Sequence, residues 1–247
     1  MASTDSSSAL NLSSAPLRKR PFEHVIVNDF ITPDIYRGLM QCFPTCPPST
    51  GPTGFSCYWG DAVYDGPVAG NVAWRTLFQA THSQRFVDYC IRTFAGVFSK
   101  HGCTIDLGKA RYVPFRETRE HKERRHILKP AHAPHELWVR TDIHQGQIGY
   151  TRARHLGHRR RLVSMLVYLC DADDNGMQGG ELVLQRPPGS WLARRDVVVR
   201  PRHNLMAAFA CHAHSYHSVP PITAQSAPRN FIQIAVSSSF DAWSTSD

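Results

Sequence analysis

Two histidines and one arginine in the C-terminal half of the chain have the types and spacing of a metal and carboxylate site. His155 precedes the apolar stretch Leu162–Leu169, His217 follows 62 residues later, and Arg229 comes 12 residues after His217. Two imidazoles can hold Fe(II), and a guanidinium pairs with a carboxylate through two parallel hydrogen bonds. The pattern predicts a metal held by His155 and His217, with Arg229 binding a carboxylate of a second molecule.

Gly157 stands two positions after His155, where an aspartate would complete a ligand set of two histidines and one carboxylate. Without that carboxylate, one coordination position of the metal is open. Asp142 or His158 could fill it, a water molecule could fill it in a hydroxylase, or the site could be inactive. The remaining interpretation is a halide ion beside Gly157, because a hydrogen side chain leaves room for an anion.

The net charge of +8 comes from one part of the chain. Residues 111–161 hold 13 Lys and Arg against 5 Asp and Glu, so the whole excess lies in the segment that includes His155. An arginine-rich solvated surface is one explanation. A small anionic substrate is the other, because the planar guanidinium fits phosphate and carboxylate groups. No basic stripe interleaved with aromatic residues is present, which argues against polymeric nucleic acid as a partner.

The composition is typical of a cytoplasmic protein. No apolar run approaches the roughly 18 residues that a membrane helix needs, and the serine-rich N-terminus lacks the apolar centre of a secretory signal. The seven cysteines form no CxxC pair, and their odd number indicates free thiols in a reducing compartment. We therefore expect a cytoplasmic location and no membrane partner.

The first hundred residues predict a helical region that supports a core. Residues 1–20 are serine-rich and are expected to be a disordered lead-in. A short strand and then a helix are expected over residues 21–44, with Thr32 as the N-cap. Residues 44–70 are expected to be a loop, because proline and glycine are frequent there. Residues 83–102 predict an amphipathic helix.

From Thr104 onward, short strands separated by turns indicate a mostly β fold with flanking helices. Eight stretches carry this signal: "KARYVPF", "ELWVRTDIHQ", "RLVSMLVYL", "GELVLQ", "DVVVRP", "NLMAAFA", "SYHSVPPI" and "NFIQIAVSSS". They predict a double-stranded β-helix, or jelly roll. We expect one domain, with a support region over residues 21–103 and a jelly-roll core over residues 104–247. The charged residues 119–135 are expected to form a loop or short helix.

Several of these segments resemble the prolyl-hydroxylase-like branch of the iron(II)/2-oxoglutarate dioxygenases. The resemblance covers roughly residues 138–239, and its most specific local matches are Gly179–Gly180–Glu181 and His217–Ser218–Val219–Pro220. The segments are "GYTRARHLGHRRRLVSMLVYL", "GGELVLQ", "HNLMAAFACHAHSYHSVPPI" and "RNFIQIAV". The resemblance implies Fe(II) on His155 and His217, 2-oxoglutarate on Arg229, and O₂ as a co-substrate.

The glycine at position 157 resembles the radical halogenases of this superfamily, in which the aspartate is replaced by Gly or Ala and chloride binds in its place. This resemblance implies a chloride-dependent enzyme that chlorinates an unactivated C–H bond, with Gly157 beside the halide. Two other classes stay open. One is a hydroxylase or demethylase of an anionic small molecule, and the other is a non-catalytic module that senses 2-oxoglutarate.

The substrate is expected to be small and anionic. The cationic residues Arg152, His158 and Arg159 near the motif favour a phosphate over an ammonium group. They suggest a (deoxy)adenosine monophosphate-type nucleotide, as in the nucleotide halogenases of nucleoside-antibiotic biosynthesis, which this chain resembles. Trp243 is expected to lie over the bound substrate, and Trp59 or Trp74 could also stack on a base. A free amino acid is the alternative substrate.

Overall fold

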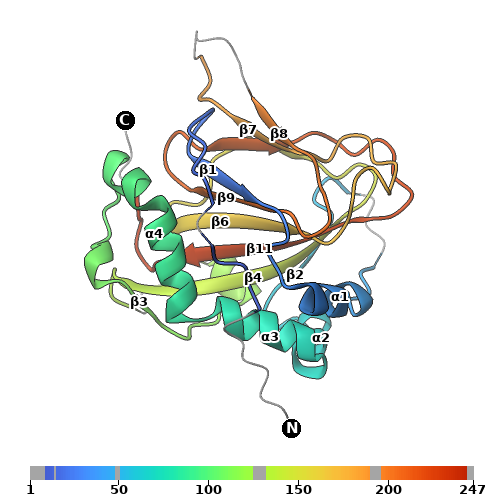
Figure 1. The fold of residues 1–247 in the computed structure, drawn as a ribbon, viewed down its shortest axis with the longest axis horizontal. Coiled ribbons are helices and arrows are strands. Elements are labelled where there is room, and N and C mark those ends of the chain that lie inside the picture. Colours follow the sequence, from blue (N-terminus) through green and yellow to red (C-terminus); the bar gives the residue numbers. More distant parts are fainter. Residues whose placement is uncertain (1–8, 14, 48–50, 125–131, 190–195, 244–247) are drawn as a thin grey trace.

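Two β-sheets face each other and form a barrel (Figure 1). The computed structural model describes residues 9–13, 15–47, 51–124, 132–189 and 196–243. The larger sheet has the strand order β1-β9-β6-β11-β4-β2, with β3 alongside β4, and the smaller sheet has the order β5-β10-β7-β8. The strands are β1 His24–Val27, β2 Phe55–Cys57, β3 Arg111–Tyr112, β4 Glu136–Gly146, β5 Arg152–His155, β6 Arg161–Tyr168, β7 Leu182–Gln185, β8 Val197–Val199, β9 Met206–Ala210, β10 Tyr216–Val219 and β11 Arg229–Ser237.

Eight consecutive strands, β4 to β11, build the barrel. Strands β4, β6, β9 and β11 belong to the larger sheet, and β5, β7, β8 and β10 to the smaller one. The chain therefore crosses repeatedly between the two sheets, which is the topology of a double-stranded β-helix. The predicted fold class, mostly β with flanking helices, is confirmed.

The alternation of side chains along β11 explains how the larger sheet separates two cores. Ile232, Ile234 and Val236 are fully buried against the helices. Phe231 points the other way and packs with the apolar side chains between the two sheets. Arg229 lies two residues before Phe231 and thus on the same face, because successive side chains of a strand alternate. The described barrel interior is therefore lined mainly by apolar side chains, and the guanidinium of Arg229 is buried among them at the start of β11.

Helices cover the outer face of the larger sheet (Figure 1). The longest, α4, begins after Ser83, whose hydroxyl accepts the backbone N–H of Phe86, and it is followed by Gly102 in the left-handed region (φ 67°). The amphipathic helix predicted over residues 83–102 is thus confirmed. The helices are α1 Pro33–Gln41, α2 Ala62–Gly70, α3 Val72–Thr81, α4 Gln84–Lys100 and α5 Arg119–Glu123, and a 3₁₀ turn spans Leu107–Lys109. In the part of the chain that the structure describes, no helix has the length and apolar character to span a membrane.

Strand β5 was not predicted, although it carries His155. Its residues Arg152–His155 are polar or exposed and lack an apolar alternation. The stretch 109–115, which was predicted as a strand, contributes only the two residues of β3, and these pair in parallel with β4 outside the barrel. The number of barrel strands is therefore as expected, but one member was misplaced.

Two stretches that were expected to lack structure are ordered. Residues 44–70 contain β2 and α2 because Tyr64 and Val68, one helical turn apart, bury their side chains. In the expected disordered lead-in, Leu10 is 7% exposed, and the backbone N–H of Thr32 donates to the carbonyl of Ala9 at 3.0 Å. Apolar Leu10 thus anchors residues 9–13, while residues 1–8 lie outside the described part. Residues 119–135 contain α5, and residues 125–131 are also outside it.

Candidate active site

His155 and His217 lie side by side on neighbouring strands of the smaller sheet. They are direct register partners of β5 and β10, and their ring centroids are 4.2 Å apart with a 54° angle between the planes. Each Nδ1 faces a backbone carbonyl, that of Ala153 at 2.7 Å and that of Ser215 at 3.0 Å. A carbonyl only accepts, so in the neutral form of each ring Nδ1 carries the proton and Nε2 keeps a lone pair. Both imidazoles therefore have the tautomer that binds a metal through Nε2.

The surroundings of the pair keep His217 uncharged. His217 is 8% exposed, and burial, together with the neighbouring His155 ring, lowers the pKa of His217 to about 3. A neutral imidazole is the form that binds a metal. His155, in contrast, is exposed. His217 therefore lies in the barrel interior, whereas solvent can reach His155.

The side of Gly157 where a side chain would begin is already filled. A Cβ at this position would lie 2.8 Å from Sγ and 2.9 Å from Cβ of Cys211, closer than real Cβ contacts. Cys211 is 3% exposed, and burial raises the pKa of its thiol to about 12, so the thiol stays neutral. We expected open space for an anion beside Gly157. On the Cβ side of this residue the expectation is wrong, because the side chain of Cys211 fills that space.

Neither of the alternative protein ligands joins the histidine pair. Asp142 is buried and pairs with Arg140 at 2.8 Å, and His158 accepts the backbone N–H of Arg160 at 3.2 Å. Among the residues described, no carboxylate, thiol or further imidazole forms a set with the pair in which all ligand atoms lie within 4.8 Å of one another. The two-histidine arrangement is thus not completed by a third side chain of these types.

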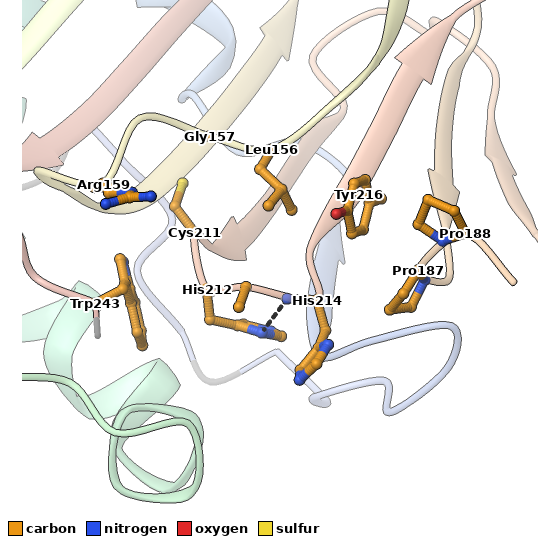
Figure 2. Close-up of a pocket in the computed structure, with 11 residues that line it drawn as sticks. Leu156, Gly157, Arg159, Pro187, Pro188, Cys211, His212, His214, Tyr216 and Trp243 are labelled. Carbon is orange, nitrogen blue, oxygen red and sulfur yellow. Dashed lines mark hydrogen bonds between the residues drawn. The ribbon is translucent and has the colours of Figure 1, made fainter. Parts of the chain in front are cut away.

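A pocket of about 380 Å³ opens next to Gly157 (Figure 2). It lies between the segment after β5, the end of β7 and the loop before β10, and two of the predicted substrate contacts, Arg159 and Trp243, line it. Trp243 is fixed by its indole N–H, which donates to the carbonyl of Arg161 at 2.9 Å. The described lining consists of Leu156, Gly157, Arg159, Pro187, Pro188, Cys211, His212, Ala213, His214, Tyr216 and Trp243.

The other expected substrate contacts lie elsewhere. The guanidinium of Arg152 donates to the carbonyl of Thr53 at 2.9 Å and lies over the ring of Tyr150, because it sits at the far end of β5 from His155. His158 does not belong to the pocket lining. Trp74 is buried among the helices, and Trp59 lines a separate cavity.

Arg229 is a buried cation whose Nη1 atom, with its two N–H donors, is unpaired in the described part of the chain. It is 0% exposed, its Nε donates to the carbonyl of Gly180 at 2.7 Å, and its Nη2 donates to the hydroxyl of Tyr168 at 3.3 Å. Its Nη1 is buried and has no hydrogen-bond partner among the described residues. Because an unpaired buried donor is costly, this atom indicates that a ligand oxygen belongs there. Sequence reasoning missed Tyr168, although the alternation along β6 places it on the interior face.

The two glycines before β7 set the position of the carbonyl that holds Arg229. Gly179 and Gly180 both have a φ of 78°, which side chains other than glycine rarely adopt. A Cβ on Gly179 would lie 2.0 Å from the carbonyl oxygen of Pro221, and one on Gly180 would lie 2.8 Å from Ile222. The predicted Gly-Gly motif therefore serves close packing of this turn, and the carbonyl of Gly180 orients the guanidinium.

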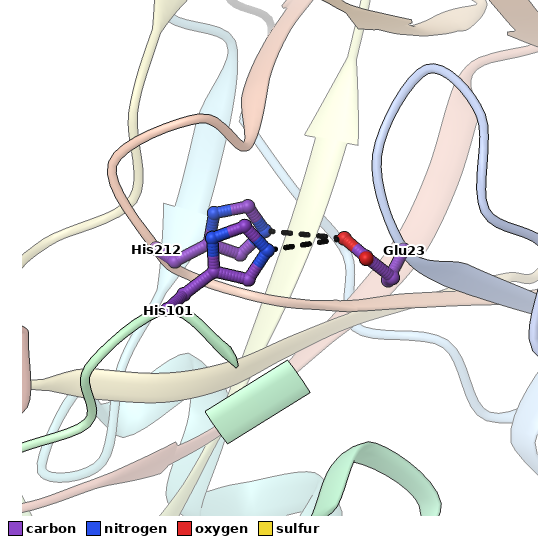
Figure 3. Close-up of side chains that lie close together, drawn as sticks. All are labelled: Glu23, His101 and His212. Carbon is purple, nitrogen blue, oxygen red and sulfur yellow. Dashed lines mark hydrogen bonds and ion pairs between the residues drawn. The ribbon is translucent and has the colours of Figure 1, made fainter. Parts of the chain in front are cut away.

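A second cluster of possible metal ligands lies beside the pocket (Figure 3). Glu23, His101 and His212 have ligand atoms within 4.8 Å of one another. Nε2 of His101 lies 3.3 Å from Oε2 of Glu23, and Nε2 of His212 lies 3.9 Å from the same oxygen. Oε1 of Glu23 accepts from Lys100 at 2.7 Å. By residue type alone, the set resembles a site of two histidines and one carboxylate.

The geometry of this cluster is poorly suited to holding a shared ion. The rings of His101 and His212 are stacked, with centroids 3.8 Å apart and an angle of 12°, so their in-plane lone pairs do not converge on one point. The backbone N–H of His214 donates to Nδ1 of His212 at 3.2 Å, which places the proton of neutral His212 on Nε2. We therefore regard Glu23 as an anchor for Lys100 and His101 and keep His155 and His217 as the candidate metal ligands.

Comparison with known proteins agrees with this geometry. Residues 138–236 match the 2OG-Fe(II) oxygenase superfamily. This range contains strands β5 to β10 completely, together with most of β4 and β11, and it includes His155, His217 and Arg229. The name of the superfamily contains Fe(II) and 2-oxoglutarate. The Nδ1 contacts of His155 and His217, which leave Nε2 to face a metal, and the unpaired Nη1 of Arg229 fit that metal and that dicarboxylate.

Several solved structures are similar to this chain, and the one with a TM-score of 0.50 shares its fold. A prolyl-4-hydroxylase from Pseudomonas putida is 14% identical with a TM-score of 0.50, over 87% of this chain and 92% of its own. An oxidoreductase of the 2OG-Fe(II) oxygenase family from Burkholderia pseudomallei is 15% identical with a TM-score of 0.49, over 89% and 86%. A prolyl hydroxylase from Trichoplax adhaerens, in complex with a hypoxia inducible factor peptide, is 14% identical with a TM-score of 0.48, over 87% and 83%. Among curated protein sequences, none matches the chain.

Proposed function

We propose that this chain is an iron(II)/2-oxoglutarate-dependent oxidoreductase. In this assignment His155 and His217 hold the metal, and Arg229 with Tyr168 holds the distal carboxylate of 2-oxoglutarate. The fixed tautomers of the two histidines and the unpaired Nη1 of Arg229 support it. Bound iron, with 2-oxoglutarate and O₂, supplies the oxidation of an unactivated C–H bond. The chain's own residues keep His217 neutral, orient both imidazoles and place the buried guanidinium of Arg229 where it can bind the carboxylate.

The reaction that the site supports best is chlorination. One observation carries this proposal: Gly157 offers no ligand atom, and no described carboxylate, thiol or imidazole completes the set of His155 and His217. A bound chloride would restore the negative charge that a carboxylate ligand normally brings. In the balanced reaction, R–H, chloride, a proton, 2-oxoglutarate and O₂ give R–Cl, succinate, CO₂ and water.

A hydroxylase is the second candidate, and the position of Cys211 favours it. The thiol fills the Cβ side of Gly157, so less space is left there than an empty ligand position would offer. A water molecule is smaller than a chloride ion and needs less room. In that case R–H, 2-oxoglutarate and O₂ give R–OH, succinate and CO₂, and chloride has no effect on the product.

The pocket favours a substrate with an anionic group and a flat ring. Arg159 and His214 line it, and no Asp or Glu belongs to its described lining. Tyr216 and Trp243 offer aromatic surface against which a base can pack. A nucleotide of the (deoxy)adenosine monophosphate type combines both features. A free amino acid carries an ammonium group, for which the described lining provides no carboxylate.

The test combines spectroscopy with product analysis. Under anaerobic conditions the protein receives Fe(II) and 2-oxoglutarate, and the metal-to-ligand charge-transfer band is followed during titration with sodium chloride, with sodium sulfate at matched ionic strength as the control. O₂ is then admitted together with deoxyadenosine monophosphate, adenosine monophosphate or a panel of free amino acids. Mass spectrometry identifies chlorinated and hydroxylated products, and His217→Ala serves as the metal-binding control.

Each result assigns the protein to one class. A chloride-dependent band and a chlorinated nucleotide support the halogenase. A band that ignores chloride, with a hydroxylated product, supports the hydroxylase. Chlorination of an amino acid but not of a nucleotide would overturn the substrate assignment. If Fe(II) and 2-oxoglutarate give no band at all, the metal assignment fails and a non-catalytic module remains.

Restoring a carboxylate at position 157 tests the open ligand position directly. Because a Cβ there meets both Sγ and Cβ of Cys211, we expect Gly157→Asp alone to be destabilised, and the variant to use is Gly157→Asp with Cys211→Gly. We expect this double variant to bind Fe(II) and lose chlorination, with some hydroxylation in its place. Chlorination at the wild-type rate in the double variant would contradict the proposal, and Cys211→Gly alone is its control.

A further inference from the structure

The contact between Gly157 and Cys211 joins two segments that are distant in sequence but meet at the pocket. Cys211 follows β9, and its backbone N–H donates to the carbonyl of Leu162 at 2.9 Å, which holds it close to the start of β6. Figure 2 shows its sulfur directed toward the segment that holds Gly157. Both residues line the same pocket. The thiol therefore occupies the place in which a side chain of residue 157 would begin.

We propose that Cys211 is a specificity-determining residue that sets the size of the anion accepted beside the metal ligands His155 and His217. This inference rests on the proposed function, because it assumes that an anion binds where a carboxylate ligand is missing. The argument is one of shape: an anion that binds next to Gly157 has Cys211 as its protein neighbour on the Cβ side. Because the Cys211 side chain is packed in the protein interior, it gives the anion position a boundary that does not move.

The chemistry of a thiol suits this role. Cys211 is buried, so it offers a neutral, polarizable sulfur and a weak S–H donor rather than a competing negative charge. A serine at this position would keep nearly the same size and replace sulfur by a less polarizable oxygen. An alanine would remove Sγ, the atom that would lie 2.8 Å from a Cβ on residue 157. The three side chains therefore separate the effect of size from the effect of sulfur.

The main experiment measures halide affinity rather than turnover. Chloride, bromide and iodide are each titrated into the anaerobic Fe(II) and 2-oxoglutarate complex of the wild type, Cys211→Ala and Cys211→Ser, and the shift of the charge-transfer band gives each dissociation constant. Loss of a close contact on one side of a ligand forfeits a large part of its packing energy. We expect Cys211→Ala to change the ratio of the chloride and iodide dissociation constants at least about fivefold in favour of iodide.

Cys90→Ala is the matched control. Cys90 is also a fully buried thiol, but it lies in α4, outside the barrel interior. We expect this variant to keep the wild-type halide ratio, and Cys211→Ser to stay within about twofold of it because the size is retained. The same ratio in Cys211→Ala and the wild type would overturn the proposal. A change in Cys90→Ala as large as in Cys211→Ala would overturn it as well.

A second measurement uses the metal-free protein and so does not depend on iron or halide binding. Gly157→Ala adds the Cβ that meets Cys211, and we expect it to lower the melting temperature by about 2–10 °C. In the Cys211→Gly background, which removes both the Sγ and the Cβ contact, the loss should be clearly smaller. Equal losses in both backgrounds would mean that the two residues do not touch.

The two measurements separate this inference from the proposed function. If the wild type shows no response to any halide, the halogenase proposal and the size-selection proposal fall together, while the melting temperatures still report on the contact. If halides bind to the wild type and the ratio is unchanged in Cys211→Ala, only the role of Cys211 is refuted.

Discussion

Replacing Arg229 by methionine is the most direct test of the 2-oxoglutarate site. The side chain is 0% exposed and makes hydrogen bonds to Gly180 and Tyr168, and its Nη1 has no partner in the described chain. In the ligand-free protein this is a buried charge that is only partly compensated. Methionine has a similar length and no charge, so it fills the space while removing every donor.

The expected loss of affinity follows from the hydrogen bonds involved. A hydrogen bond to a charged group contributes about 1.5–3 kcal/mol, and about 1.4 kcal/mol is a factor of ten in the dissociation constant. Loss of two such bonds to a carboxylate therefore weakens 2-oxoglutarate binding by at least about 100-fold. Arg229→Lys keeps the charge but loses the planar fork, so we expect an intermediate loss. Tyr168→Phe removes one partner of the guanidinium and should cost about tenfold or less.

A thermal-shift assay with Mn(II) in place of Fe(II) measures this without turnover. At a concentration 100 times its dissociation constant, a ligand stabilises the folded state by about 2.7 kcal/mol, or about 5–11 °C for a chain of this size. We expect Arg229→Met to lose this shift, while its melting temperature without ligand stays within about 8 °C of the wild type. A full shift in Arg229→Met would refute the role of Arg229, and a collapse of the ligand-free protein would mark the residue as structural.

Three further predictions concern the histidines and the pocket. His217→Ala should abolish Co(II) binding in equilibrium dialysis, because one of two protein ligands is lost; retained binding at wild-type affinity would exclude this metal site. Burial and the adjacent His101 ring lower the pKa of His212 from 6.5 to about 3, so the unfolded chain takes up a proton first, and the unfolding free energy should fall as pH drops from 6.5 toward 3. The slope from His212 is at most about 1.4 kcal/mol per pH unit, and His212→Asn should show a flatter dependence in urea titrations. Arg159→Ala should weaken binding of deoxyadenosine monophosphate about tenfold or more in calorimetry, whereas Arg152→Ala should not, and equal effects would contradict the pocket assignment.

The fold and the candidate site residues could be predicted because their signals are local or follow an order along the chain. Short apolar strands between turns indicated the jelly roll, and the structure confirms it. The spacing of His155, His217 and Arg229 placed each at the edge of a strand, and the structure brings the two histidines together as register partners. The Gly-Gly turn was also recognisable, because a positive φ and close packing leave few alternatives to glycine.

The features that escaped prediction depend on contacts between distant segments. Tyr168 becomes a partner of Arg229 only because β6 and β11 are neighbours, and its tyrosine type alone does not indicate that role. Cys211 lies 54 positions from Gly157, and nothing in its local sequence points to that contact. Arg152 was placed near the substrate by its distance in sequence, but an extended strand carries it away from His155.

The unequal burial of His155 and His217 has a consequence for how a metal ion would bind to and leave the proposed site. In the proposed metal site, an ion would reach the pair from the solvent side, where the exposed ring of His155 lies, and would leave by the same route. Chelators in the medium would therefore compete mainly for the ligand position at His155. A substrate bound over His155 would slow both the arrival and the release of iron, and would thus protect the proposed site from metal loss.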